Sequence, residues 1–557
     1  MKAKRKRLPV GVDDYNELYN ECYFIDKTKL IGKIIDSHCK VTLITRPRRF
    51  GKTLNMNMLY YFFTSDNAAE NSKLFADTDI ERMGEEYMAE QGAYPTVFVT
   101  LKGVYAIDYE GALGLLALLM QDLYGKFNYL MKSEALTEKE KEYFDRIWSK
   151  STDKDDLQLA LKRLTDFLCR HHKKKVILLI DEYDVMIQAA WEHGYYEKAI
   201  AFVRVFLGEA LKSNASLHFA VLTGVLRVAK ESIFSSLNNF KVDSVISAEY
   251  ATSFGFTQEE VNKMARDLGY EDKLPEIKSW YDGYHFSGYD MYNPWSVINY
   301  FAANADAAPY WVNTSANGIL KTMLESLDEE RAAELKGLME GKTVETEIKE
   351  GVIYADINKN RDALYTMLVT TGYLQCIERK RVYDKEYVSL TIPNREIRAI
   401  FDSEICDNLA VGLGGSTVYF MMKAMLDGDT ELFALRLQSI LKETVSVHDT
   451  AQPETFYHGL MLGLTVLLSD TYTVESNRES GYGRFDLALI PKDSANVGVI
   501  MEFKRAESEG ELERKAAEAL EQIAAKEYIT RLTASGVKTI WRYGIAFFGK
   551  RMFLERG

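Results

Sequence analysis

Hydrophobic positions in the first 250 residues alternate between short unbroken runs and longer amphipathic segments. The unbroken runs, rich in β-branched residues, occupy residues 41–45, 96–101, 176–180 and 217–224. Runs of this length are typical of strands buried on both faces, and the segments 156–172 and 195–213 have helical spacing. Because strands and helices alternate, the sequence predicts an α/β domain with a parallel sheet and right-handed crossovers.

The segment RPRRFGKT, residues 46–53, follows the first run and precedes a helical pattern. A phosphate-binding loop reads G-x-x-x-x-G-K-[ST]; Gly51, Lys52 and Thr53 match it, whereas Arg46 replaces the first glycine. In strand–loop–helix order, the loop N–H groups and the helix N-terminus surround one phosphate-sized space. We therefore predict an ATP site in which Lys52 contacts the outer phosphates and Thr53 holds Mg²⁺.

Three arginines make this loop unusual: Arg46, Arg48 and Arg49. One interpretation is a solvated basic loop, and the other is additional contact with phosphate or substrate. The turn that the missing glycine would make could come from Pro47 and its neighbours.

A second acidic element follows the run at 176–180. Asp181 and Glu182 lie at its carboxyl end, where open α/β sheets bind ligands. The Asp181 carboxylate is a hard oxygen ligand of the kind that Mg²⁺ prefers, and Glu182 could act as the base that orients the attacking water. Thr223, at the end of a neighbouring run, could sense the γ-phosphate. Arg227 and Lys230 follow this run. Each is either a candidate for stabilising charge in the transition state or an ordinary surface cation.

The middle of the chain turns helical after Tyr250. Thr257 and Glu260 form a predicted capping box, and the aromatic turn at 281–284 precedes a further helix at Asn293-Pro294. We expect a lid here, with its aromatic residues in the core.

A helix at 362–374, a strand pair at 376–394 and a helix at 395–405 suggest a winged-helix-like module. Its hairpin carries Arg379, Lys380 and Arg381, which could touch a nucleic-acid backbone. Asp384 and Glu386 favour a solvated hairpin instead.

The last hundred residues read helix–strand–strand–strand–helix–strand. The segments 484–490 and 497–505 are joined by PKDSAN and are symmetric about Ser494, so Asp486 and Glu502 can face each other. Alternation places Lys504 beside Glu502. Two converging carboxylates suit a divalent metal, and a lysine near a phosphate suits metal-assisted phosphodiester cleavage. The structural alternative is an exposed cross-strand ion pair.

Composition limits the class of protein. The 557 residues, 47% hydrophobic and 27% charged, predict two or three globular domains, and the net charge of -13 restricts nucleic-acid binding to local basic patches. The five cysteines lack C-x-x-C spacing, which favours a reducing compartment without structural zinc. Because no apolar run has signal-peptide or membrane-spanning character, we expect a cytoplasmic protein without membrane partners.

An ordered set of motifs runs through nearly the whole chain. They are LPVGVDDY, YFIDKTKLI, RPRRFGKTL, LLIDEYD, LTGVLRVAKESIFSSLNN, FGFTQEEV, WYDGYHF, YNPWSV, YWVNTSAN, TGYL and IPNREI. With them the chain resembles the bacterial and archaeal AAA-ATPase-like proteins that carry a C-terminal PD-(D/E)XK nuclease-like domain. In that family an arginine-led loop commonly replaces the glycine-led one.

The resemblance implies a P-loop ATPase domain at 1–250, a helical lid with a winged-helix-like region at 251–400, and a nuclease-like domain with its helical lead-in at 401–557. The implied nucleotide-site residues are Arg49, Phe50, Gly51, Lys52, Thr53, Asp181, Glu182, Thr223 and Arg227. The implied nuclease-site residues are Asp486, Glu502 and Lys504, with Glu454 and Gln522 as accessory residues and Mg²⁺ or Mn²⁺ as the metal.

Phe485 stands where the nuclease pattern has proline. We expect ATP hydrolysis coupled to a nuclease-like domain that acts on DNA or RNA. The alternative is an ATP-switched interaction protein whose nuclease-like domain binds partners without cutting. Both interpretations are compatible with a homo-oligomer.

Overall fold

Two compact units make up the protein. The structure is a computed structural model that describes residues 7–226, 240–311, 320, 329–339, 341–348, 360–383, 385–409, 415–444, 455–465, 468, 471–480, 483–526 and 528–557. The first unit comprises residues 1–314 with 345–396, and the second comprises residues 315–344 with 397–557. The division into three parts at residues 250 and 400 stays a prediction.

A five-stranded parallel sheet forms the centre of the first unit. Its order is β2 (Thr96–Thr100), β3 (Val176–Asp181), β4 (Leu217–Gly224), β1 (Val41–Thr45) and β5 (Phe240–Asp243). The predicted parallel sheet is therefore confirmed. Since β4 lies between β1 and β3, the carboxyl ends of these three strands are neighbours at one edge.

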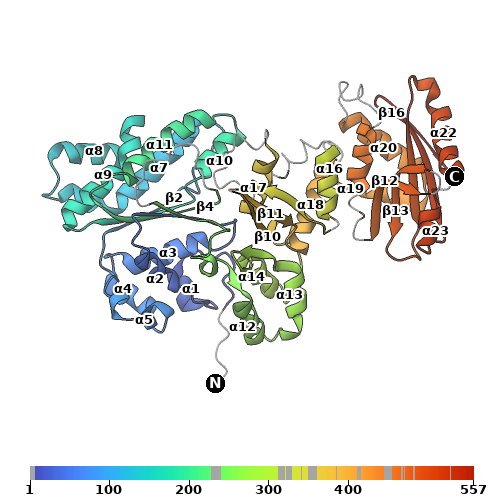
Figure 1. Ribbon diagram of the computed structural model, residues 1–557. Coiled ribbons are helices and arrows are strands. Elements are labelled where there is room, and N and C mark those ends of the chain that lie inside the picture. The colour runs from blue at the N-terminus through green and yellow to red at the C-terminus, as the bar shows by residue number, and fades with distance from the viewer. Residues whose placement is uncertain are drawn as a thin grey trace. The chain divides into compact units, whose positions relative to one another are not determined.

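Helices cover both faces of this sheet (Figure 1). One face carries α1 (Tyr15–Glu21), α2 (Lys29–Asp36), α3 (Lys52–Phe63), α4 (Ala68–Asn71) and α5 (Asp79–Met83). The other carries α7 (Tyr109–Lys126), α8 (Glu138–Trp148), α9 (Lys154–His172), α10 (Val185–Glu192) and α11 (Tyr196–Leu211). Buried side chains of α1 to α3 form one core with Ile44, Ile177 and Val221 of the sheet.

The rest of the first unit contains two small sheets. One has the order β6 (Phe256–Thr257), β8 (Tyr289–Tyr292), β7 (Tyr284–Phe286), with α12 (Gln258–Leu268), α13 (Leu274–Tyr281) and α14 (Pro294–Ala302). Thr257 and Glu260 form the predicted capping box, and Asn293 caps α14 as predicted. The other sheet has the order β10 (Gln375–Val382), β11 (Lys385–Thr391), β9 (Val344–Glu347).

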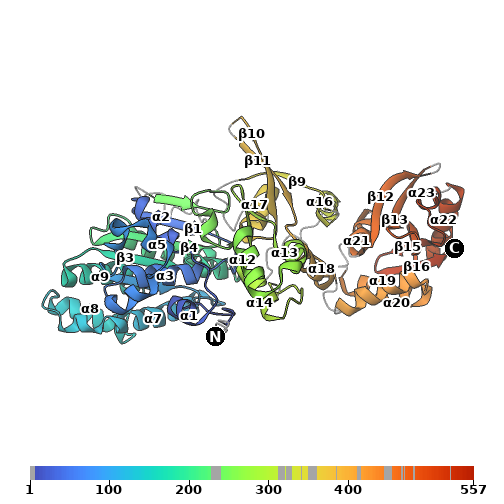
Figure 2. The same cartoon turned by 90° about the horizontal axis from the view of Figure 1, so that it is seen from below.

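The β10–β11 hairpin follows α17 (Arg361–Thr371) and precedes α18 (Arg395–Leu409), in the predicted helix–hairpin–helix order. It extends away from α12 to α14 (Figure 2). Along α17 the seven residues from Ala363 to Val369 are buried, so this helix is covered on all sides.

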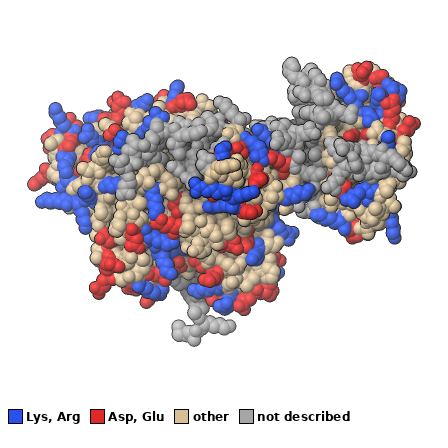
Figure 3. All heavy atoms as spheres, viewed as in Figure 1, with Lys and Arg blue, Asp and Glu red and all other residues tan. Residues whose placement is uncertain are grey.

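Acidic and basic side chains are interspersed over the face shown in Figure 3.

The second unit is built on a mixed sheet. Its order is β12 (Tyr472–Ser480), β13 (Gly483–Pro491), β14 (Gly498–Arg505), β15 (Ile540–Phe548), β16 (Arg551–Arg556), and only the β14–β15 pair is parallel. β16 was not predicted from the sequence. α16 (Glu329–Met339) also belongs to this unit.

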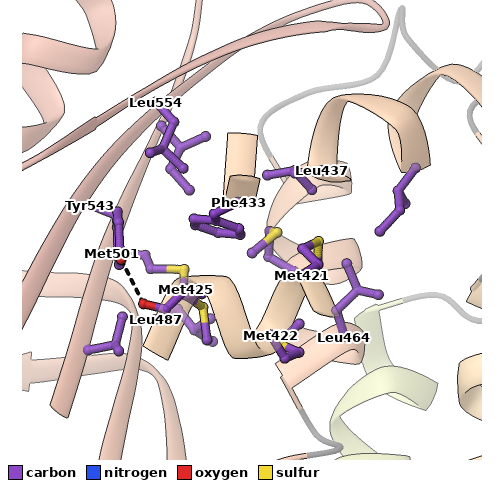
Figure 4. Close-up of a cluster of buried hydrophobic side chains, with 14 of the residues drawn as sticks. Met421, Met422, Met425, Phe433, Leu437, Leu464, Leu487, Met501, Tyr543 and Leu554 are labelled. Carbon is purple, nitrogen blue, oxygen red and sulfur yellow. Dashed lines mark hydrogen bonds between the residues drawn. The ribbon is translucent and has the colours of Figure 1, made fainter. Parts of the chain in front are cut away.

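Helices pack on both faces of this sheet. α19 (Gly415–Asp427), α20 (Thr430–Thr444) and α21 (Thr455–Thr465) contribute to a methionine-rich core with Phe433 and Tyr543 (Figure 4). The Tyr543 hydroxyl donates to the Met425 carbonyl at 2.7 Å. The opposite core contains Ile523 on α22 (Leu512–Ala525) and Leu532 on α23 (Thr530–Ala534).

Candidate functional site

The predicted phosphate-binding loop connects β1 to α3. Gly51 precedes α3 with φ of 77°, and a Cβ placed on it would meet no atom within 4 Å. A residue with a side chain adopts this left-handed conformation at a cost, which explains the glycine at this position. The loop backbone at Gly51 therefore borders open space at the N-terminus of a 12-residue helix, as an anion site requires.

Lys52 is folded onto the loop. Its Nζ donates to the carbonyls of Arg46 and Pro47, both at 3.0 Å, and the side chain is 4% exposed. Burial lowers the pKa of Lys52, while the charges of Glu182, Asp184 and Asp181 oppose that shift. The ammonium group thus lies within the loop without a carboxylate in salt-bridge contact among the described residues.

Asp181 connects the loop to two strand ends. Its fully buried carboxylate accepts hydrogen bonds from Thr53 Oγ1 at 2.8 Å and Thr223 Oγ1 at 2.6 Å. A third hydroxyl, Thr100 Oγ1 at the end of β2, lies 3.2 Å from Asp181 Oδ2. The structure therefore brings together Thr53, Asp181 and Thr223. Thr100 was missed, although its place at the end of a predicted strand was a usable signal.

Glu182 follows Asp181 with φ of 51°. Its charge raises the pKa of Arg49 and of Lys52 against the lowering effect of burial, which places it on the loop side of the sheet edge. Asp184 was not predicted: its carboxylate accepts the N–H groups of Val225 and Leu226, each at 2.9 Å, and burial raises its pKa. Arg227 and Lys230 lie outside the described residues.

Neither predicted role fits Arg46. It is fully buried, and its guanidinium contacts the Asp243 carboxylate at 2.5 Å and the Thr45 carbonyl at 2.8 Å. The rings of Phe254 and Phe286 each lie 5.4 Å from it. Arg46 therefore fixes the start of the loop to β5. The interpretations as a phosphate contact or a solvated cation were wrong for this residue, because the turn enters the protein rather than solvent.

Phe50 is also turned inward. Its ring lies 4.9 Å from that of Tyr284 and 5.3 Å from that of Phe286, in the β7–β8 hairpin. A Cβ on Gly255 would come within 3.0 Å of Phe50, so the packing there depends on glycine. The Phe50 side chain thus belongs to the core, and only the Phe50 backbone can contribute to the proposed phosphate site.

The two remaining arginines contact other elements. The exposed Arg49 side chain lies over the Trp295 ring at 4.1 Å, and Arg48 donates to Gln188 Oε1 at 2.8 Å. The Arg48 carbonyl accepts the indole N–H of Trp311 at 3.4 Å. The aromatic motifs of the middle region therefore hold the loop from one side.

Beyond the loop, Glu396 is a buried carboxyl that the sequence did not reveal. It is 0% exposed, and it accepts hydrogen bonds from the Ser296 hydroxyl at 2.7 Å and from the backbone N–H of Trp311 at 3.0 Å. Burial raises the pKa of Glu396 to about 7. Glu396, Trp311 and the Arg48 carbonyl form a continuous chain of contacts to the loop.

The basic hairpin is divided in its contacts. Arg379 donates to the Ile246 carbonyl at 3.0 Å and lies 3.7 Å from Glu386. Lys380 and Arg381 are exposed, and Asp384 lies outside the described residues.

In the second unit, β13 and β14 pair in the register predicted from the sequence. Leu487 opposes Met501 and Leu489 opposes Val499, a register that continued by one residue sets Asp486 against Glu502. The paired region ends at Leu487–Met501, and beyond it Asp486 Oδ2 accepts the backbone N–H of Phe503 at 2.7 Å. Beyond the last backbone pair, the Asp486 side chain therefore links the two strands through this hydrogen bond.

Glu502 is the most strongly perturbed carboxyl of this group. It is 2% exposed; Oε1 accepts Lys504 Nζ at 3.3 Å and Gln522 Nε2, while Oε2 is buried without a hydrogen-bond partner among the described residues. Burial, and next the charge of Asp486, raise the pKa of Glu502 to about 7. Burial also raises the pKa of Asp486. The structure thus joins Asp486, Glu502, Lys504 and Gln522.

Two further side chains of this site were missed. His458 on α21 lies 2.8 Å from Ser476 Oγ, and its charge opposes the burial effect on the pKa of Asp486. Tyr528 Oη accepts Gln522 Nε2 at 3.2 Å. The signal for His458 was its place four positions after Glu454 in the sequence; Glu454 itself lies outside the described residues.

These donors fit a divalent cation in chemistry, and the described residues supply two carboxylates for it, Asp486 and Glu502. An unpartnered buried carboxylate oxygen beside a second carboxylate is stabilised by a bound cation. Among the described residues, however, no group of three or more His, Cys, Asp and Glu side chains could hold a metal. Across all the residues that the structure describes, no helix combines the length and hydrophobicity needed to cross a membrane.

Comparisons with known proteins agree with this division. Residues 9–234 match the family described as "Predicted AAA-ATPase", and residues 452–557 match the PD-(D/E)XK nuclease superfamily. The chain therefore carries an AAA-ATPase-like domain followed by a PD-(D/E)XK nuclease superfamily domain. It is 25% identical over 568 residues to the "Uncharacterized protein in vnfD 5'region" of Azotobacter chroococcum mcd 1, covering 98% of this chain and 96% of that protein.

Proposed function

We propose that the first unit binds and hydrolyses Mg-ATP. The observation that carries this proposal is the Asp181 carboxylate, which joins Thr53 at the start of α3 to Thr223 at the end of β4. A hydroxyl and a carboxylate at the end of a phosphate-binding loop are the hard oxygen ligands that Mg²⁺ takes beside a nucleotide.

The residues of the loop and its neighbours would divide the work. Lys52 would leave the Arg46 and Pro47 carbonyls for the outer phosphates, and the N–H groups from Arg49 to Thr53 would surround them. Thr53 and Asp181 would hold Mg²⁺, which neutralises phosphate charge when bound. Glu182 would orient the attacking water, and Thr223 would report on the γ-phosphate. Arg227 is the proposed transition-state cation.

Thermal unfolding with Mg-ATP tests this proposal. At about one hundred times the dissociation constant, ligand binding should add about 2.7 kcal/mol of stability. Lys52→Ala should remove that gain, and Glu182→Gln should keep it while stopping phosphate release. Wild-type protein that gains no stability from saturating Mg-ATP would contradict the proposal.

For the second unit we propose metal-dependent cleavage of a phosphodiester. The buried, unpartnered Oε2 of Glu502 supports this assignment, because a surface ion pair would leave no such atom. Asp486 and Glu502 would hold Mg²⁺ or Mn²⁺, which supplies Lewis-acid chemistry when bound. Lys504 would stabilise the reacting phosphate, and Gln522 holds Glu502 in place. Glu454 is the proposed third acidic residue.

The alternative is an ATP-switched protein whose nuclease-like domain binds partners without cutting. Both proposals assume a cytoplasmic location and are compatible with a homo-oligomer, and the nuclease proposal takes DNA or RNA as the partner. Incubation of the full chain with mixed DNA and RNA substrates and each metal separates them: metal-dependent cleavage that Lys504→Ala abolishes supports the nuclease, whereas binding without cleavage supports the alternative.

A further inference from the structure

A cluster of basic side chains, four lysines and one histidine, lies at the edge of the parallel sheet where its strands begin. Lys40 precedes β1, Lys173, Lys174 and Lys175 precede β3, and His218 is the second residue of β4. We call these five residues the strand-start patch. Parallel strands begin at the edge opposite their carboxyl ends, so the patch lies across the sheet from Lys52, Asp181 and Thr223.

Direct contacts join most of the patch into one surface. The Tyr94 and His218 rings are stacked at 4.5 Å, and Lys174 Nζ lies 4.4 Å from the centre of the Tyr94 ring. Lys40 Nζ donates to the His218 carbonyl at 3.0 Å. Tyr94 is 8% exposed, so its ring supports the cations from beneath.

The positive charges of the patch are poorly neutralised. Lys173, Lys174 and Lys175 are exposed, and in the described part of the chain none forms a salt bridge within 4.0 Å. Burial lowers the pKa of Lys40, and the charge of Lys175 lowers it further. Burial is the largest effect on His218 and lowers its pKa. The charge of Glu90 raises this pKa, and the charges of Lys40, Lys175 and Lys174 lower it further.

Helix chemistry explains only part of this arrangement. Lys173 is the C-cap of α9, where a cation interacts favourably with the helix dipole. That effect falls off within the last turn, so it does not account for Lys175, for Lys40 or for His218 on other strands. Unrelieved repulsion between like charges is what a bound polyanion would remove.

We propose that the strand-start patch binds the phosphate backbone of double-stranded nucleic acid without reading its sequence. The choice of nucleic acid rests on the proposed nuclease function of the second unit. A membrane-binding surface combines cations with exposed apolar anchors. None of the large exposed hydrophobic side chains among the described residues belongs to the segments 38–40, 90–94, 171–175 or 212–218.

The β10–β11 hairpin is a weaker candidate for this contact. Its Arg379 is already engaged with Glu386 and the Ile246 carbonyl, and α17 is too buried to enter a groove. The strand-start patch, by contrast, presents three lysines in sequence on one sheet edge, and none of them is paired with a carboxylate of the described chain.

Anisotropy measurements with a labelled duplex of about 30 base pairs test the proposal, at salt concentrations from about 50 to about 200 mM. The test variant carries Lys173→Gln, Lys174→Gln and Lys175→Gln. The control carries Lys263→Gln, Lys273→Gln and Lys278→Gln, which removes the same charge from α12, α13 and the turn between them.

The test variant should bind at least about tenfold more weakly, and its salt slope should fall by about 0.9 for each phosphate that it no longer neutralises. The control should stay within about twofold of wild type, since long-range charge effects are screened. The measurements contain no divalent metal, so duplex affinity is compared without cleavage, and a failure of this proposal is separated from a failure of the proposed nuclease. Mg-ATP stabilisation should be unchanged in both variants, which shows that both are folded.

Three outcomes would overturn the proposal. Wild-type protein could fail to bind the duplex at the lowest salt concentration. The test and control variants could lose affinity equally, which would indicate an effect of net charge alone. Wild-type protein could instead bind phosphatidylserine vesicles more tightly than the duplex, with the test variant losing that binding, which would assign the patch to a membrane surface.

Discussion

At the scale of single residues, Arg46 explains how the proposed phosphate-binding loop begins without glycine. Its guanidinium is desolvated and paired with Asp243, with two aromatic rings around it. A buried ion pair adds little to stability by itself, but removing one partner leaves an uncompensated charge in the core. The residue is therefore a structural requirement of the loop as it stands.

Restoring the glycine-led pattern with Arg46→Gly should destabilise the protein by about 3 to 5 kcal/mol, because Asp243 would stay buried and unpaired. Urea unfolding measures the loss. Arg48→Gly is the matched control, since it makes the same backbone change in the same loop at a half-buried side chain. Adding Asp243→Asn to Arg46→Gly should recover part of the stability; equal losses in the two single variants would contradict this account.

Glu396 predicts a pH dependence of stability. Its folded pKa of about 7 lies above the ordinary value of 4.5, so between these values the folded state holds a proton that the unfolded state has released. Stability is then greatest below the unfolded pKa and falls as pH rises through the folded one, by about 3 kcal/mol in total.

The variant Glu396→Gln should lack this contribution and should be more stable than wild type at about pH 8, but not at about pH 4.5. Its amide can keep both contacts, with Oε1 accepting the Trp311 N–H and Nε2 donating to the Ser296 hydroxyl. Urea unfolding at the two pH values gives the difference. Glu378→Gln, at an exposed position on β10, should show no such pH-dependent difference.

At the scale of elements, the β13–β14 hairpin sets the geometry of the second site. Its ladder ends at Leu487–Met501, and the strands beyond that point carry Asp486 and Glu502. The raised pKa of Glu502 means that a cation must displace a proton there below about pH 7.

Divalent affinity of the full chain should therefore rise by up to about tenfold per unit between about pH 5 and pH 7, and then level off. Asp486→Asn should weaken Mn²⁺ binding, whereas Lys504→Ala should keep it and remove most cleavage. Calorimetric Mn²⁺ titration measures the binding, and a nuclease assay measures the cleavage. Glu521→Gln, an exposed change beside Gln522, should behave as wild type; an unchanged affinity in Asp486→Asn would rule out this metal site.

The elements also show what sequence can predict. The register of this hairpin followed from its symmetry about Ser494, and the parallel sheet followed from hydrophobic runs, because both are local patterns. The pairing of Arg46 with Asp243 could not be predicted, since the partners lie 197 positions apart and become neighbours only when β5 joins β1. Glu396 was missed for the same reason. β16 was missed because its pattern is short and contains only one buried residue.

At the scale of the whole molecule, the loop is held by residues far along the first unit. Phe50 contacts β7, Arg49 contacts α14 through Trp295, and the Arg48 carbonyl contacts Trp311, which Glu396 fixes in turn. Nucleotide binding at the loop should therefore change the stability of the middle region, not only of the sheet.

Amide hydrogen exchange tests this coupling. Saturating Mg-ATP should slow exchange in residues 42–59 and also in residues 284–297, because both contribute to one packed contact. Lys52→Ala should abolish both effects. Residues 498–505 in the second unit serve as an internal comparison. Protection confined to residues 42–59 would show that the middle region does not respond to the nucleotide.

The burial of Arg46 has a consequence for how such sites evolve. A glycine at the start of the loop satisfies its own backbone requirement, whereas an arginine there ties the loop to an acid on another strand. The constraint thereby moves from one position to a pair, and substitutions at 46 and 243 should be inherited together. In related chains, an acidic residue on the edge strand beside the loop strand would then mark an arginine-led loop, and loss of one partner should accompany loss of the other.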